Sequence, residues 1–309
     1  MRRYIFLIFL FFPLHFLKAD ITDDFPSYNY VFNELDIPED YIYNRDFQEF
    51  VYKNRDRYRK FFIQAMNRGR LIIPTMRELM YRKDISPIFI YLAMVESGFK
   101  TQAISSSSAG GLWQFIKSTA LSEHLRVDDI IDERYDPIKA TNVAIDYLYK
   151  IHNRLGKWYL TAMGYNCGAG CVQKSIEKAG TTDLATLVDP KANYIRKETR
   201  KYIKKILLFA MIGENYLFKR GDNLGVMKYK YDNDLLVPVR VRGGEYLRNI
   251  ASVLNMDFYI LKQMNLHLRK DFIPLNGNIN VNIPASRFQM FYSRYYHKNL
   301  LIREALNRY

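Results

Sequence analysis

A single acidic residue, Glu96, ends an apolar stretch of the sequence. Residues 88–95 are Ile-Phe-Ile-Tyr-Leu-Ala-Met-Val, and Glu96 follows them directly. Apolar surroundings disfavour the ionised form of a carboxyl group and raise its pKa. A carboxylic acid that stays protonated near neutral pH can give its proton to a leaving-group oxygen. Glu96 is therefore the first candidate for an acid catalyst, and a glutamate that caps a helix or pairs with an arginine is the structural alternative.

Two polar segments later in the chain are candidates for binding a ligand beside that acid. The first is a serine- and glycine-containing loop, residues 105–111, that runs into Leu-Trp-Gln-Phe at residues 112–115. The second ends a predicted helix with Tyr165 and Asn166 and turns at residues 168–170. Hydroxyls, amides and exposed backbone N–H groups of this kind bind polar ligands. Taken alone, the first segment also fits a serine-rich linker and the second an ordinary turn between helices.

In combination, these segments resemble the SLT family of lytic transglycosylases, whose members share the goose-type lysozyme fold. The resemblance extends over residues 75–215, and the variant with Trp113 is most similar to the membrane-bound D branch of that family. Gly164 and Cys167 stand where the family usually has alanine, and both are small enough to keep the turn intact. The motifs that carry the resemblance are, in order, Glu96-Ser97, residues 111–114 (Gly-Leu-Trp-Gln), residues 164–168 (Gly-Tyr-Asn-Cys-Gly) and residues 198–202 (Glu-Thr-Arg-Lys-Tyr).

The resemblance implies a lyase that cleaves the β-1,4 bond between N-acetylmuramic acid and N-acetylglucosamine in peptidoglycan. Glu96 would protonate the glycosidic oxygen and then accept the proton of the muramoyl C6 hydroxyl, whose oxygen attacks C1 and leaves a 1,6-anhydromuramoyl end. One carboxylate is enough for this cycle, whereas most glycoside hydrolases use two. No cofactor and no metal is implied. The resemblance also implies that Gly111, which has no side chain, allows the backbone to approach the substrate. It assigns sugar contacts to Ser105, Ser107, Gln114, Phe115, Tyr165, Asn166 and Tyr202.

Two other functions stay open. A lysozyme-like muramidase would hydrolyse the same bond with a second acid. A non-catalytic peptidoglycan-binding scaffold would use the cleft only for attachment, although an intact Glu96 argues against it. The five histidines show no metal-ligand spacing, and the chain has neither a phosphate-binding loop nor a dinucleotide fingerprint. Candidates for the second acid of a muramidase are Asp128, Asp129, Asp132, Glu133 and Asp136.

Helical periodicity dominates the part of the chain that must position these groups. Apolar residues recur at steps of three and four over residues 47–66, which predicts an amphipathic helix. Pro74 opens the next predicted helix, and residues 88–95 are typical of a helix buried on every side. Residues 20–45, with two prolines, predict an extended lead-in. Further helices are predicted at residues 138–155, 159–164, 171–179 and 194–218.

After residue 235 the pattern changes to a small βααβ unit. Residues 235–241 and 279–283 alternate as strands do, and residues 246–254 and 259–264 predict two short helices. The opening resembles a LysM module, which binds N-acetylglucosamine chains, although Gly-Glu-Tyr at residues 244–246 replaces the usual Gly-Asp-Thr. A purely structural role of the unit stays open. The predicted fold class is mainly α, a lysozyme-like helical catalytic domain followed by a small LysM-like βααβ domain.

The last residues are predicted to form a basic, aromatic helix in which one acid, Glu304, accompanies five cations. Such a helix either packs on the catalytic domain or lies on an anionic membrane surface. Packing is the first expectation, because an aromatic stripe is costly to expose. The predicted divisions of the chain are a signal peptide (1–19), a lead-in and packing helix (20–74), the catalytic domain (75–218), a linker (219–235), the LysM-like domain (236–285) and the C-terminal helix (286–309).

Composition and the first residues indicate the compartment. The chain has 309 residues, with 46 Lys and Arg against 32 Asp and Glu, so its formal net charge is +14. With 49% hydrophobic and 25% charged residues, it has a globular composition, which excludes a disordered, collagenous or polytopic membrane protein. Arg2, Arg3 and an apolar run over residues 4–16 predict the signal peptide. Asp20 stands where a lipoprotein has cysteine, which argues against a lipid anchor.

Export decides which partners the positive charge favours. Outside the cytosol the abundant polyanions are cell-wall carboxylates, phosphate polymers and lipid headgroups. We therefore expect an exported, periplasmic protein that binds peptidoglycan glycan strands, with an anionic membrane surface as a second partner and no nucleic acid. An uncleaved membrane anchor at the N-terminus is the alternative to a signal peptide.

The two cysteines, Cys167 and Cys171, lie four residues apart where a turn enters a predicted helix. In an oxidising compartment they can pair, and so short a loop would contribute at most about 2 kcal/mol in the chain-entropy model. Two small buried thiols are an equally good interpretation.

Overall fold

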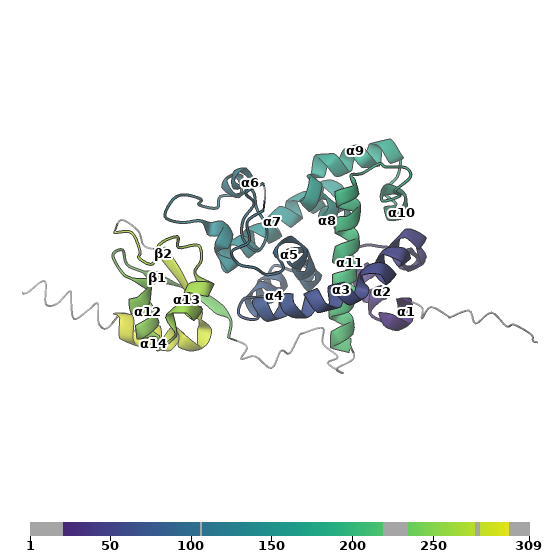
Figure 1. Ribbon diagram of the computed structural model, residues 1–309. Coiled ribbons are helices and arrows are strands. Elements are labelled where there is room, and N and C mark those ends of the chain that lie inside the picture. Colours follow the sequence, from purple (N-terminus) through teal and green to yellow (C-terminus); the bar gives the residue numbers. More distant parts are fainter. Residues whose placement is uncertain (1–20, 106, 219–233, 276–278, 297–309) are drawn as a thin grey trace, which may run out of the picture.

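The computed structural model describes residues 21–105, 107–218, 234–275 and 279–296. Figure 1 shows a large helical part and, at one end of the molecule, a smaller part that contains a two-stranded sheet. The predicted mainly helical fold with a small βααβ unit is confirmed. The predicted signal peptide and most of the predicted linker lie outside the described residues. No helix in the described part of the chain is long and apolar enough to cross a bilayer.

The segment before the predicted catalytic domain is helical, so the prediction of an extended lead-in over residues 20–45 is wrong. Ile21, Phe25 and Phe32 are fully buried in the large core, and this packing stabilises helices that are too short to be stable alone. The predicted amphipathic helix is confirmed and is longer than expected. The elements are α1 (Ile21–Asp24), α2 (Tyr28–Asn33), a 3₁₀ turn (Glu39–Tyr43) and α3 (Arg45–Gly69).

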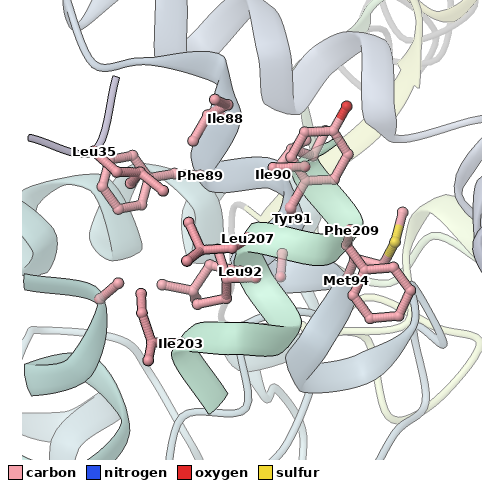
Figure 2. Close-up of a cluster of buried hydrophobic side chains, with 14 of the residues drawn as sticks. Leu35, Ile88, Phe89, Ile90, Tyr91, Leu92, Met94, Ile203, Leu207 and Phe209 are labelled. Carbon is pink, nitrogen blue, oxygen red and sulfur yellow. The ribbon is translucent and has the colours of Figure 1, made fainter. Parts of the chain in front are cut away.

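The helical domain is built around α5 (Ile90–Ser97), which follows a 3₁₀ turn (Pro87–Phe89). This helix is apolar on all sides and must therefore be buried on all sides. Figure 2 shows its side chains in one cluster with Ile203, Leu207 and Phe209 of the last helix of the domain. The remaining helices are α4 (Ile73–Arg82), α6 (Lys117–Ser122), α7 (Pro137–Leu155), α8 (Trp158–Cys167), α9 (Ala169–Ala179), α10 (Leu184–Leu187) and α11 (Lys197–Phe218).

Helix α11 connects most of this domain, because it packs on α2, α3, α5 and α8. Figure 1 shows it crossing α3 at a steep angle. The helices predicted from periodicity are all present, and α6 and α10 add two short helices that the pattern does not predict. The core of the helical domain therefore includes residues before 75, because α1 to α3 contribute to the same buried cluster.

The small domain pairs β1 (Leu236–Val241) with β2 (Ile279–Pro284) in an antiparallel ladder. Two helices, α12 (Leu247–Val253) and α13 (Phe258–Met264), lie between the strands in the chain, as predicted. Alternate residues of β1 face a separate core, in which Val239 and Val241 are buried.

The described part of the predicted C-terminal helix is short and irregular. A 3₁₀ turn (Ala285–Arg287), α14 (Phe288–Phe291) and a π-helical turn (Tyr292–Tyr296) follow one another. Phe291 and Tyr295 stack on each other, with ring centroids 4.7 Å apart, and are buried in the core of the small domain. The described part of this segment therefore packs on the small domain. Phe288 and Tyr292 stay exposed, so contact with a membrane surface remains a prediction.

Candidate active site

Glu96 lies in the last turn of α5, and the local sequence fixes where that helix ends. Gly98 adopts φ = +58°, a left-handed conformation that ends the helix and favours glycine. The Ser97 hydroxyl donates to the carbonyl oxygen of Ala93 at 3.1 Å, and Arg68 of α3 donates to the carbonyl oxygen of Gly98 at 2.9 Å. The backbone beside Glu96 is therefore held from two helices.

The carboxyl group of Glu96 meets the phenol of Tyr202, which α11 brings from 106 residues away. The Tyr202 hydroxyl donates a hydrogen bond to Oε1 of Glu96. Burial raises the pKa of Glu96 to about 7, and the Tyr202 hydrogen bond and the charge of Lys205 only partly oppose this rise. No arginine among the described residues forms an ion pair with Glu96. The site thus holds an acid that keeps a proton near neutral pH.

Aromatic side chains form one wall beside this acid. The Tyr165 hydroxyl donates to the carbonyl oxygen of Trp113 at 2.8 Å, which joins α8 to the polar loop. The Tyr165 ring lies 5.6 Å from the Tyr147 ring and 6.1 Å from the Phe115 ring, between centroids. Burial and the charge of Glu96 raise the pKa of the Tyr165 phenol, so Tyr165 lies within electrostatic reach of the acid.

Asn166 joins the same region from the end of α8. Its Oδ1 accepts a hydrogen bond of 2.7 Å from the Thr199 hydroxyl, three residues before Tyr202 on α11. A disulfide between Cys167 and Cys171 then ties the end of α8 to α9. The structure therefore brings Glu96, Tyr165, Asn166 and Tyr202 together, from three helices.

The polar loop holds itself together through the side chains that were predicted to bind sugar. The Ser105 and Ser107 hydroxyl oxygens are 2.9 Å apart, and Ser105 Oγ also accepts from the backbone N–H of Ala109. The Gln114 amide donates to the carbonyl oxygen of Ala103 at 3.1 Å and to that of Gly111 at 2.8 Å. Ser107 is exposed, whereas the nitrogen of Gln114 is already used inside the loop.

Two of the predicted substrate contacts have another explanation. Gly111 adopts φ = +78°, and a Cβ atom there would lie 1.8 Å from the carbonyl oxygen of Arg134, so protein backbone fills the space expected for substrate. Phe115 is only 3% exposed and packs against Tyr147 and Tyr165. Both residues therefore pack closely against other parts of the protein, and their contact with a sugar stays a prediction.

The loop is organised by Arg134, a residue that the sequence motifs do not single out. Arg134 donates to both carboxylate oxygens of Asp132, at 2.9 and 2.8 Å, and to the carbonyl oxygens of Ser108 and Phe115. Bidentate pairs of this kind fix geometry as well as energy. The only signal in the sequence is an arginine within an acidic segment, and the acids of that segment were predicted to be catalytic candidates.

Most of the candidate second acids have structural partners instead. Asp132 is fully buried against Arg134, and Glu133 accepts from Lys139 and from the backbone N–H of Arg126. Asp136 caps the start of α7. Backbone N–H groups and Arg126 lower the pKa of Asp128 to about 2. Asp129 is exposed. Among the described carboxylates, only Glu198 contributes to the shift in the pKa of Glu96.

Comparison with known proteins agrees with both domains. Residues 75–188 match the transglycosylase SLT domain family, and residues 236–298 match the family of the LysM-like domain of lytic transglycosylase MltD. The second match includes the C-terminal segment that packs on the small domain, beyond the predicted boundary at residue 285.

Individual relatives agree with these families. Membrane-bound lytic murein transglycosylase D from Escherichia coli K12 is 27% identical over 66% of this chain and 44% of its own length. Membrane-bound lytic murein transglycosylase C from Actinobacillus pleuropneumoniae is 30% identical over 45% of this chain and 44% of its own length. The chain thus spans less than half the length of these relatives.

A solved structure is also similar to the chain. The 70 kDa soluble lytic transglycosylase from Escherichia coli is 22% identical, with a TM-score of 0.40 over 50% of this chain and 25% of its own. The family assignment rests on the two domain matches, which confirm the predicted resemblance. The chain thus contains one segment that matches the transglycosylase SLT domain family and a second that matches the LysM-like domain family of lytic transglycosylase MltD.

Proposed function

We propose that this protein is a lytic murein transglycosylase, which cleaves the β-1,4 bond between N-acetylmuramic acid and N-acetylglucosamine without water. The observation that carries the proposal is the Glu96 carboxyl group, whose pKa of about 7 and hydrogen bond from Tyr202 suit a group that gives and then takes a proton. The family of residues 75–188 and the names of the relatives support the same reaction.

The proposed cycle uses one carboxyl group twice. Protonated Glu96 gives its proton to the glycosidic oxygen as the C1–O bond breaks, and the carboxylate that results is stabilised by the Tyr202 hydroxyl. The same carboxylate then takes the proton of the muramoyl C6 hydroxyl while the C6 oxygen bonds to C1. The product carries a 1,6-anhydromuramoyl end, Glu96 returns to its protonated form, and no cofactor takes part.

The contacts to the sugars are proposed from the positions of the side chains. Ser105, Ser107, Tyr165, Asn166 and Tyr202 supply hydroxyl and amide groups on the loop and helices around Glu96. Gln114 and Phe115 act indirectly, because the first holds the loop and the second supports the aromatic wall. The LysM-like domain would add attachment to glycan strands, as linked modules raise the effective concentration of a substrate.

We also propose an exported, periplasmic location. The relatives named above are membrane-bound murein enzymes, and residues 1–19 have the pattern of a signal peptide. The net charge of +14 suits an envelope rich in carboxylates and anionic lipids. Fractionation of cells that produce the full chain, with and without residues 1–19, tests this location.

A hydrolase is the second candidate, because Glu198 is a carboxylate that acts on Glu96. Mass spectrometry of muropeptides released from purified sacculi separates the two reactions, since anhydro products weigh one water less than hydrolytic products. We expect anhydro products, and we expect Glu96→Gln to lower the rate by roughly 10² to 10⁴. Hydrolytic products that disappear with Glu198→Gln would favour the muramidase instead. More than about a tenth of the activity left in Glu96→Gln would exclude Glu96 as the acid.

A further inference from the structure

A cavity of about 430 Å³ opens beside Glu96, on the side of α3 and α11. Its volume falls within the roughly 300–1,000 Å³ typical of small-molecule sites. Val95, the residue before Glu96, lines it, as do Arg57 and Phe61 of α3 and Lys201 and Lys205 of α11. Helices α3 and α11 both lie outside residues 75–188, the segment that matches the SLT family, so that match leaves most of the cavity lining uncovered.

Three cations gather around the cavity, and the carboxylates whose charges act on Lys205 are Glu96 and Glu198. Arg57, Lys201 and Lys205 form no ion pair within the described residues, whereas Lys204, next to Lys205, pairs with Asp46 on α3. Burial, with the charges of Lys201 and Arg57, lowers the pKa of the half-buried Lys205, although the charge of Glu96 opposes this. Like charges held this close cost free energy that an anion would offset.

The rest of the lining is aromatic and suits an apolar chain that carries the anion. Tyr58 and Phe209 stack, with ring centroids 4.9 Å apart, and Arg57 lies over the Tyr58 ring at 5.0 Å. Phe61 is 36% exposed, a large apolar side chain left open beside the cations. A free inorganic ion would leave these rings unused, whereas a carboxylate on a peptide would contact both kinds of group.

We propose that this cavity binds a carboxylate of the peptide stem carried by the muramoyl residue of the substrate. The inference rests on the proposed function. The lactyl group of muramic acid carries a peptide with free carboxylates, so a muramoyl residue placed for proton transfer at Glu96 brings its own peptide beside Val95. Arg57, Lys201 and Lys205 then bind the carboxylate, and Phe61 contacts the apolar part of the peptide.

The test compares the full chain on two glycan substrates of equal length, one with intact peptide stems and one from which an amidase has removed them. The quantity measured is the ratio of kcat/KM on the first to kcat/KM on the second. We expect the wild type to prefer the peptide-bearing strand. Arg57→Gln and Lys201→Gln should each lower the ratio about tenfold, mainly through KM, as loss of a charge-assisted contact does. Lys60→Gln, an exposed cation of α3 that does not line the cavity, is the matched control and should keep the wild-type ratio.

The outcomes separate the two proposals. A wild-type ratio near one, or variants that keep the wild-type ratio, would overturn the peptide site while cleavage itself continues. A ratio that also falls in Lys60→Gln would show a general effect of charge and would equally overturn it. Absence of anhydro products from both strands would instead contradict the proposed function.

Discussion

The ionised carboxyl group of Glu96 opposes folding, because the folded protein shifts its pKa from 4.5 to about 7. Between these values the folded protein holds a proton that the unfolded chain has released. The free energy of unfolding therefore falls as the pH rises through this window and stays lower above it. With about 1.36 kcal/mol for each unit of pKa, the cost above pH 7 is at most about 3 kcal/mol.

Glu96→Gln should therefore be more stable than the wild type at pH 8 and nearly equal to it at pH 4.5. Glutamine keeps an oxygen that can accept from Tyr202 and has no charge to desolvate. Denaturant unfolding at the two pH values measures the difference, and Glu177→Gln, an exposed glutamate of α9, should show no such pH-dependent gain. A gain of the same size at both pH values would mean that burial of the Glu96 charge is not its cause.

Tyr202→Phe tests how the acid is tuned. The Tyr202 hydroxyl stabilises the ionised form of Glu96, so its removal should raise the pKa of Glu96 further. The variant should then stay active to higher pH than the wild type, because Glu96 loses its proton at higher pH. Its kcat should fall, because the carboxyl group is held less firmly. The pH profile of kcat/KM measures this shift. Tyr149→Phe, whose hydroxyl binds the carbonyl oxygens of Lys83 and Asp84, should leave the alkaline limb in place.

At the scale of elements, periodicity predicted the long helices and both strands, because each buries one continuous face. It failed for α1 and α2, whose four and six residues are too few to show a period. Tertiary contacts stabilise them instead: Asp24 of α1 binds Arg55 of α3 and Asn215 of α11, and α2 packs on α11. The site was predicted in part. Glu96, Tyr165, Asn166 and Tyr202 meet as expected, but the roles of Gly111 and Arg134 depend on a contact between residues 23 positions apart, which no local pattern shows.

Gly111→Ala tests that contact. The added Cβ would lie 1.8 Å from the Arg134 carbonyl oxygen, so the loop or the segment at Arg134 must move. This overpacking should lower the free energy of unfolding by about 1–3 kcal/mol. The strain of an alanine at φ = +78° adds to that loss. Gly156→Ala is the matched control, since Gly156 has φ = +73° and nothing within 4 Å of its added Cβ. Thermal unfolding should therefore show a larger loss for Gly111→Ala. Equal losses would mean that backbone conformation alone requires glycine.

At the scale of the whole molecule, the two domains share an interface that reaches the polar loop. Arg269 of the small domain donates to Asp132 at 2.8 Å, and Asp132 also binds Arg134, which holds two carbonyl oxygens of the loop. Asn282 of β2 donates to Asp136 at 3.1 Å, and the Ile131 side chain is buried in the core of the small domain. The LysM-like domain is thus packed against the helical domain and is not only tethered to it.

Deletion of residues 236–309 should for this reason harm the helical domain itself. It would expose Ile131 and leave Asp132 and Asp136 without their partners in the small domain, which should lower the free energy of unfolding by at least about 2 kcal/mol. Because Asp132 positions Arg134, cleavage of short soluble glycans should fall as well, and not only retention on sacculi.

Calorimetry of the full chain should accordingly show one cooperative transition. Arg269→Ala should lower the midpoint of that transition more than Lys270→Ala does. Lys270 is an exposed neighbour whose side chain has no hydrogen bond to the helical domain among the described residues. The Arg269 side chain is 45% exposed, so solvent screening limits this point effect to about 1 kcal/mol or less. The deletion should exceed it, since it also removes the apolar contact of Ile131. The domains would be independent if calorimetry showed two separate transitions and if the truncated chain kept the wild-type midpoint and the wild-type rate on soluble glycans.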